Sequence, residues 1–492
     1  MGSSALSLTE QMLRRRPAVG APVAHGASDH LKRSIGTFQL TMFGVGATVG
    51  TGIFIVLQQA VPKAGPAVLV SFILAGIAAG LSAICYAEMA AAVPVSGSTY
   101  SYAYTTMGEV VAMGVAACLL LEYGVSMSAT SIGWSQYLNE LLNNVFGFRI
   151  PEALTSAPWG TEHPGIMNLP ATILIALCAL LLIRGASESA TVNTIMVIIK
   201  LAVLALFVAV AFTAFNSDHF HDFWAKGFHG ITGAAATIFF TFIGLDAVST
   251  AGDEVKNPQK TMPRAIIAAL LVVTSIYILV AFAGLGTQDA AEFGSDEQAE
   301  AGLSVILRNV LHGQTWASNI LALGAVISIF SVTLVVMYGQ TRILFAMGRD
   351  GLLPSRFAKV NPTTMTPVNN TIIVAIITGL LAGFVPIDYL WDLVSIGTLV
   401  AFIVVSVGVI ILRVREPDLP RSFKVPGYPV TPVLSVLACL IVLAGLPRIT
   451  WVWFILWVAV VLVFYFLWSR HHSALNDGGD GVIPTVAPGV GS

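Results

Sequence analysis

The chain has 492 residues, of which 56% are apolar and 10% are charged, with a formal net charge of −2. A soluble domain carries about 25% charged residues, so a soluble chain of this length would lack the charge to cover its surface. Apolar stretches of about 18 to 25 residues recur along nearly the whole chain, and each is long enough to cross a bilayer. The composition therefore predicts an integral membrane protein embedded in the lipid bilayer, and the near-neutral charge argues against a nucleic-acid partner.

The chain begins with a polar tail and continues through twelve predicted spans. Residues 1–37 carry Arg14, Arg15 and Arg16, and no apolar segment follows at the distance of a signal peptide. The predicted spans are 38–60, 67–90, 108–136, 169–184, 191–213, 231–250, 264–287, 318–347, 370–387, 389–413, 430–446 and 450–468.

These spans predict an all-α membrane fold in five parts, with spans 1 and 6 discontinuous. The parts are a cytoplasmic tail (1–37), a first five-helix repeat (38–213), a second, inverted five-helix repeat (231–413), two accessory helices (430–468) and a disordered cytoplasmic tail (469–492). The expected location is the plasma membrane. The tails and the even-numbered loops, together with the span ends that adjoin them, hold 18 of the 24 lysines and arginines, which predicts that both termini are cytoplasmic.

The first span is rich in glycine at its centre. It reads FQLTMFGVGATVGTGIFIVLQQAV, with Gly44, Gly46, Gly50 and Gly52 inside it. A glycine weakens a helix by about 1 kcal/mol relative to alanine, so this run favours local unwinding. Unwound backbone at mid-membrane is tolerated only where it faces protein or a polar cavity. The alternative is that Gly46 and Gly50 form a small-residue face for helix packing.

Two charged side chains lie near the centres of predicted spans. Glu122 lies in span 108–136 and Lys200 in span 191–213. A lysine at that depth costs about 2.5 to 3.5 kcal/mol on insertion scales, which marks it as functional or as one half of an ion pair. Glu122 could carry a proton, face a cationic side chain of a substrate, or hydrogen-bond to a neighbouring helix. These two residues are the candidates for proton coupling.

The sixth span repeats the pattern of the first. It reads ITGAAATIFFTFIGLDAVSTAGDEV, with Gly244 followed by Asp246 and Ser249. Spans 1 and 6 begin successive five-helix blocks, and glycine-broken spans at matching positions of two repeats indicate a transporter binding site. Free N–H groups at one helix end would hold a carboxylate, and free C=O groups at another would hold an ammonium. An amino acid presents both groups.

Several strings closely resemble the amino acid–polyamine–organocation superfamily, and specifically the bacterial members of its cationic amino acid transporter family. The most specific are FTFIGLDAVSTAGDEVKNPQKTMPRAI (240–266) and YGQTRILFAMGRDGLLP (338–354), while GVGATVGTGIF (44–54) resembles the family's first-helix binding loop. The resemblance covers roughly residues 36 to 468. It implies the LeuT-like fold, in which two inverted five-helix repeats are followed by two further helices.

The resemblance also implies roles for individual residues. The substrate carboxylate would meet backbone amides at Gly50 to Gly52, its ammonium would meet carbonyls near Thr48 and in 239–241, and an aromatic residue of the sixth helix would line the pocket. Lys200 resembles a stand-in for the sodium ion of related carriers, tied to span 1 carbonyls near Ala47. The implied substrate-binding residues are Thr48, Val49, Gly50, Thr51, Gly52, Phe239, Phe240, Thr241, Ile243 and Gly244.

The leading hypothesis is secondary active amino acid transport by proton symport and alternating access. An uncoupled amino acid exchanger or facilitator is the alternative. A membrane enzyme is disfavoured because the chain has neither a GxSxG motif nor a His/Asp cluster, and no histidine spacing indicates a metal site. No cofactor is expected apart from the coupling proton. The choice between small neutral and cationic substrates stays open, and the sequence predicts no oligomeric state.

Overall fold

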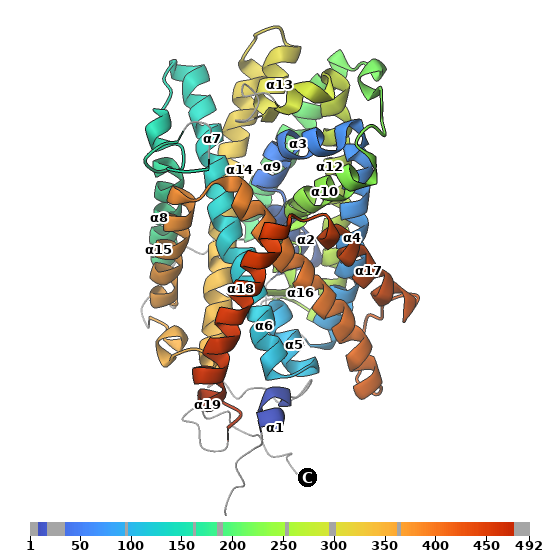
Figure 1. Cartoon of the computed structure of the whole chain (residues 1–492), viewed down its shortest axis with the longest axis vertical. Helices are drawn as coiled ribbons and strands as arrows, with labels where there is room; N and C mark the ends of the chain where they lie inside the picture. The colour runs from blue at the N-terminus through green and yellow to red at the C-terminus, as the bar shows by residue number, and fades with distance from the viewer. Residues whose placement is uncertain are drawn as a thin grey trace, which may run out of the picture.

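The structure is a computed structural model that describes residues 8–16, 35–93, 97–160, 164–184, 190–250, 255–294, 302–361 and 366–476. Within these ranges the chain forms an elongated bundle of helices, with α1 and α19 at one end and α13 at the other (Figure 1). We call the end with α1 and α19 the terminal face. The helices are α1 (Leu8–Leu13), α2 (Thr37–Thr48), α3 (Thr51–Ala64), α4 (Val68–Ala92), α5 (Ser98–Thr106), α6 (Glu109–Leu119), α7 (Ser126–Phe146), α8 (Leu169–Ile183), α9 (Ala190–Ala211), α10 (Gly227–Phe239), α11 (Ala247–Thr250), α12 (Pro258–Thr287), α13 (Gly302–Val310), α14 (Trp316–Arg349), α15 (Val368–Phe384), α16 (Ile387–Arg415), α17 (Val430–Ala444), α18 (Arg448–Phe464) and α19 (Arg470–His472).

The helices have the length and composition of membrane spans. Eight helical stretches of the described chain are long and apolar enough to cross a bilayer, and α8, α15 and α17 are shorter apolar helices. Large apolar side chains are exposed on the outer faces of α8, α15 and α18, for example Leu180, Leu380 and Leu456. In water such a surface would be unfavourable, whereas lipid covers it at no cost. The chain is an integral, multi-pass membrane protein.

The helices lie close to the predicted apolar stretches, with two clear differences: α5 is a buried helix between two predicted spans, and the third span ends later than predicted. The predicted end is residue 136, but α7 continues to Phe146. The extra turns contain Asn139 and Glu140, which the sequence assigns to a loop because they are polar. Both side chains are buried, and Glu140 accepts a hydrogen bond from Arg308 of α13 at 2.9 Å. A partner far away in the sequence therefore extends the helix.

The helices pack in two groups around the middle of the bundle. α12 packs against α4 and α2, and α10 packs against α3 and α4. In the second group α14 packs against α7 and α9, and α15 packs against α8. α16 contacts members of both groups, including α4 and α7. The two interrupted helices, α2–α3 and α10–α11, lie at the junction.

The predicted disordered tail differs from the structure at its start. Residues 470–472 form α19, and the hydroxyl of Ser469 donates to the carbonyl of Leu352 at 2.8 Å. Ser473 and Asn476 are also hydrogen-bonded, to Glu109 and to the carbonyl of Arg470. The rest of the predicted tail, 477–492, lies outside the described residues.

Candidate functional site

The first interruption separates α2 from α3. α2 ends at Thr48, Val49 and Gly50 leave the helical conformation, and α3 begins at Thr51. The hydroxyl of Thr51 donates to the carbonyl of Thr130 in α7 at 3.0 Å, which fixes the start of α3 against its neighbour. The first N–H groups of a helix have no partner within it, so the start of α3 presents donors in the middle of the protein.

The second interruption follows α10. The helix tightens into a 3-10 turn at Phe240–Phe242, and Ile243 then adopts an extended conformation. Gly244 has a φ of +92°, a region that L-amino acids with side chains rarely occupy. The short helix α11 begins at Ala247. The end of α10 therefore presents carbonyl groups that a continuous helix would have used itself.

The two interruptions lie directly against each other. A Cβ atom on Gly52 would lie 2.9 Å from the Cα of Thr241, and one on Gly244 would lie 2.6 Å from the carbonyl oxygen of Ala47. Neither position has room for a larger residue without movement of backbone. The glycines thus serve two purposes, because they weaken the helices and also let the unwound segments touch.

Two side chains from other helices donate hydrogen bonds to the unwound segments. Lys200 of α9 is fully buried, and its Nζ donates to the carbonyl of Gly46 at 2.9 Å. Tyr277 of α12 is also fully buried, and its hydroxyl lies 3.0 Å from the carbonyl oxygen of Thr48 and 2.8 Å from that of Thr241. Buried backbone acceptors in the membrane interior therefore receive donors from side chains.

A third group of polar residues lies on the terminal side of the interruptions. The chain forms a π-helical turn at Leu120–Val125, between α6 and α7, and this turn carries Glu122 and Tyr123. The hydroxyl of Tyr123 donates to Asp246 at 2.8 Å, and the hydroxyl of Ser98 in α5 donates to the same carboxylate oxygen at 3.0 Å. Glu122 is buried, and Asp246 is among its polar neighbours. π-helical turns often mark functional sites.

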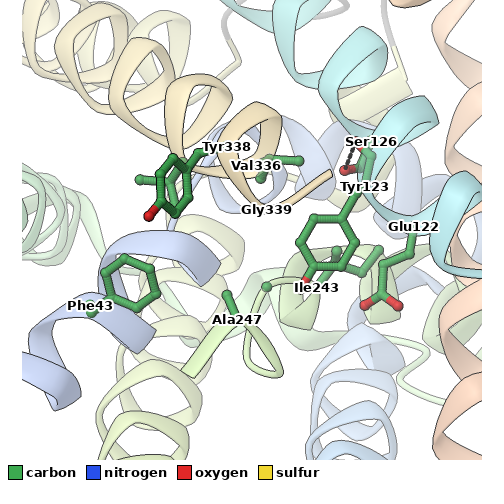
Figure 2. Close-up of a pocket in the computed structure, with 11 residues that line it drawn as sticks. Phe43, Glu122, Tyr123, Ser126, Ile243, Ala247, Val336, Tyr338 and Gly339 are labelled. Atoms are coloured by element: carbon green, nitrogen blue, oxygen red, sulfur yellow. Dashed lines mark hydrogen bonds between the residues drawn. The ribbon is translucent and has the colours of Figure 1, made fainter. Parts of the chain in front are cut away.

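A small cavity lies between these groups (Figure 2). Its volume of about 10 Å³ is close to the minimum for one water molecule. An amino acid does not fit in this conformation, so binding requires the surrounding helices to separate. The cavity is lined by Phe43, Glu122, Tyr123, Ser126, Ile243, Gly244, Ala247, Val335, Val336, Tyr338 and Gly339.

Contacts with other helices also hold the residues at either end of the second interruption. Away from the terminal face, Phe240 stacks on Trp391 of α16, with ring centroids 4.3 Å apart and planes within 11°. Toward the terminal face, Asp246 is tied to Ser98 and Tyr123 by the hydrogen bonds described above. Both ends of the second interruption are therefore held by side chains of other helices, and the space left between the groups is the small cavity described above.

Only some of the predicted site residues line the cavity. The ten predicted substrate-binding residues all lie at or beside the two interruptions, but among them only Ile243 and Gly244 line the cavity. Glu122 lines it, and Lys200 instead contacts the backbone behind it. Sequence reasoning missed Tyr277, which occurs in an ordinary apolar run, and Tyr123, whose partner Asp246 is 123 positions away.

In a multi-pass membrane chain, two facing interrupted helices are the arrangement typical of a transporter binding site. Comparison with known proteins then identifies the family: the chain belongs to the amino acid permease family, whose model matches residues 35–473. This match spans nearly all of the described chain.

Several characterised proteins are similar over most of their length. The branched-chain amino acid permease BcaP of Bacillus subtilis is 43% identical over 95% of this chain and 99% of its own. The methylthioribose transporter of the same organism is 43% identical over 92% of this chain and 97% of its own. The vacuolar cationic amino acid transporter 2 of Arabidopsis thaliana is 35% identical, over 84% of this chain and 65% of its own.

Proposed function

We propose that this permease carries an amino acid across the plasma membrane by alternating access, in symport with protons. The observation that carries the proposal is the pair of facing interruptions. The start of α3 at Thr51 offers N–H donors for a carboxylate, and the end of α10 offers carbonyl acceptors for an ammonium. A substrate with both groups, a few ångströms apart, matches this arrangement, and the names of most of the relatives cited above agree with it.

The proposed topology has twelve membrane crossings, with both termini in the cytoplasm. Two inverted five-helix repeats, α2–α9 and α10–α16, would be followed by the accessory helices α17 and α18. The asymmetry of lysines and arginines between the loops supports this orientation. A cysteine introduced on the tail, probed with a membrane-impermeant maleimide in intact cells and in inverted vesicles, tests it. Labelling in intact cells would contradict a cytoplasmic tail.

The proposed substrate is an amino acid with an aliphatic side chain. The cavity beneath the interruptions is lined by apolar groups such as Phe43, Ile243, Ala247 and Val336, which suit a branched aliphatic side chain. Glu122 is the acidic residue in this lining, and it would instead favour a cationic side chain if it faced one unprotonated. Competition between leucine or valine and arginine or lysine separates these two choices.

A second candidate substrate is methylthioribose, because a transporter of that name is as similar to this chain as the branched-chain permease. Methylthioribose has neither a carboxylate nor an ammonium, so it would use the donors and acceptors of the interruptions only through its hydroxyl groups. The apolar lining would suit its thioether. An uncoupled exchanger is the alternative mechanism for either substrate.

Uptake into proteoliposomes tests the substrate and the coupling to protons together. The purified permease is reconstituted, a pH gradient is imposed, and uptake of radiolabelled leucine is measured in the presence of each of the twenty amino acids and of methylthioribose. The proposal expects inhibition by a few aliphatic amino acids and accumulation that depends on the pH gradient. Uptake of radiolabelled methylthioribose without any uptake of leucine would reject the amino acid assignment, and exchange without any dependence on the pH gradient would reject symport.

A further inference from the structure

Tyr277 joins the two interrupted helices through a single hydroxyl group. The residue lies in the second half of α12 and is fully buried. Its hydroxyl oxygen is 3.0 Å from the carbonyl oxygen of Thr48, at the end of α2, and 2.8 Å from that of Thr241, in the turn after α10. The two carbonyls come from different interruptions, so the tyrosine is a bridge between them.

The hydroxyl occupies the position that an ammonium group would take. A nitrogen that donates to two carbonyls lies about 2.8 to 3.0 Å from both oxygens, and this is where the tyrosine oxygen lies. The carbonyl of Thr48 also accepts from the N–H of Gly50 at 2.9 Å. The carbonyl of Thr241 accepts from the hydroxyl of Tyr277, within the part of the chain that the structure describes. A hydroxyl has one proton for the two oxygens, and an ammonium has three.

We propose that Tyr277 is a positioning residue that substitutes for the substrate's ammonium group in the empty carrier. This inference rests on the proposed function, because it requires a substrate with an ammonium. In the empty, closed conformation the hydroxyl provides a donor for both carbonyls and holds the interruptions together. When substrate binds, its ammonium takes these carbonyls and the hydroxyl moves aside. The two carbonyls therefore have a hydrogen-bond donor both in the empty carrier and in the carrier with substrate bound.

The consequence concerns one particular step of the transport cycle. Net uptake requires the empty carrier to return across the membrane through a closed conformation, in which the carbonyls need a donor. Exchange of one substrate for another does not require the empty carrier to close and return, because the carrier crosses the membrane with substrate bound in both directions. Without the hydroxyl, a closed empty carrier has a buried carbonyl with no partner, which raises the energy of that state alone. Tyr277 should therefore matter for net uptake and much less for exchange.

The test compares Tyr277→Phe with wild type in both transport modes, using radiolabelled leucine in proteoliposomes. Net uptake by Tyr277→Phe is expected to fall roughly tenfold, the size of effect expected when one buried acceptor loses its partner. Exchange is expected to stay within about twofold of wild type, and its half-saturating leucine concentration should decrease, because the substrate no longer displaces a hydroxyl.

Tyr137→Phe is the matched control. Its hydroxyl also donates to a carbonyl of an interrupted helix, that of Phe54 at 2.7 Å, but Phe54 lies inside α3, where the backbone provides a donor. This variant should show the same ratio of net uptake to exchange as wild type. Equal loss of both modes in Tyr277→Phe, or an unchanged ratio, would overturn the inference. If wild type transports no amino acid in either mode, the proposed function itself fails, which is a different result.

Discussion

A buried lysine in the middle of α9 needs a compensating interaction. Lys200 has no exposed surface, and its Nζ donates to the Gly46 carbonyl just before the first interruption. An ammonium in this position costs free energy unless it is paired, and a mobile proton could remove the cost by leaving. The contact would then hold α2 to α9 when the lysine is charged and loosen when it is neutral. This link between charge and geometry is the reason for proposing a role of Lys200 in proton coupling.

Lys200→Gln separates the charge from the hydrogen bond. Glutamine keeps an N–H donor but cannot bind and release the proton, so we expect accumulation driven by a pH gradient to be abolished while exchange persists. Uptake and counterflow in the same proteoliposomes measure the two. Lys63→Gln is the control, because Lys63 also donates to a residue of an interrupted helix, Thr237 at 2.7 Å, but its side chain is exposed. Intact pH-driven uptake in Lys200→Gln would reject the role.

The closeness of the two interruptions makes Gly52 sensitive to a single methyl group. In Gly52→Ala the new Cβ would lie 2.9 Å from the Cα of Thr241, so backbone must shift, at a cost of about 1 to 3 kcal/mol for such overpacking. We expect substrate affinity to fall by about tenfold or more, measured as the half-saturating concentration in exchange. Gly114→Ala in α6 is the control, because nothing lies within 4 Å of its new methyl group. Equal behaviour of the two variants would contradict the close approach.

The sequence predicts the positions of the helices well. It predicts much less of the contacts that the interrupted segments make. Apolar length predicts the spans, and the glycine run around Gly50 and the single Gly244 predict where two of them unwind, because these are local properties. The bridge from Tyr277 to these segments depends on which helices are neighbours, and an apolar run such as TSIYILV carries no signal of it. The π-helical turn at Leu120–Val125 is equally hidden, since an ordinary helical pattern continues through it.

A buried ion pair joins α4 to α16 and to the loop that follows it. Glu88 of α4 accepts from Nε and Nη2 of Arg413 at 2.8 and 2.6 Å, and from the N–H of Val425 at 2.6 Å. Arg413 also lies over the ring of Tyr428, 4.2 Å from its centroid. The Glu88 carboxylate thus connects α4, α16 and the loop between α16 and α17.

Glu88→Gln should lower the thermal stability of the detergent-solubilised protein. Removing the carboxylate charge leaves Arg413, which is partly exposed, and the buried Arg421, 3.5 Å away, without their common partner, at a cost of about 1 to 3 kcal/mol. Thermal unfolding followed by tryptophan fluorescence gives the midpoint. Glu416→Gln, at an exposed position in the same loop, should leave the midpoint unchanged. Similar midpoints for the two variants would show that the pair contributes little to the fold.

Both ends of the described chain meet at the terminal face of the molecule. Glu109, at the start of α6, is fully buried and accepts from Nε and Nη2 of Arg14 at 2.7 Å each, from the Tyr104 hydroxyl at 2.8 Å and from the Ser473 hydroxyl at 2.6 Å. Nη2 of Arg14 also donates to the carbonyl of Arg470 at 2.9 Å. One arginine therefore connects the N-terminal segment, the C-terminal segment and the helical bundle.

A second carboxylate strengthens this junction. Asp350, directly after α14, accepts from the hydroxyl of Tyr100 at 2.8 Å and from Arg16 at 3.3 Å, and its carbonyl accepts from the N–H of Ala474 at 2.9 Å. Burial raises the pKa of the Asp350 carboxyl, and the guanidinium of Arg16 opposes that shift. The two tails thus dock on the ends of α6 and α14 through charges that local sequence gives no reason to pair.

Arg14→Ala should weaken the whole molecule and not only the tail. The variant leaves the Glu109 carboxylate buried with hydroxyl donors but without a cation, so the free energy of unfolding is expected to fall by about 3 to 5 kcal/mol, and the midpoint of thermal unfolding falls with it. Arg15→Ala is the matched control, because Arg15 is the adjacent arginine and is exposed. The double variant Arg14→Ala/Glu109→Gln tests the pairing itself, since two residues in contact should show a smaller loss together than the sum of their separate losses. Strictly additive losses would mean that the Arg14–Glu109 contact does not contribute, and the two tails would then be docked by their other contacts, such as those of Arg16 and Ala474 with Asp350.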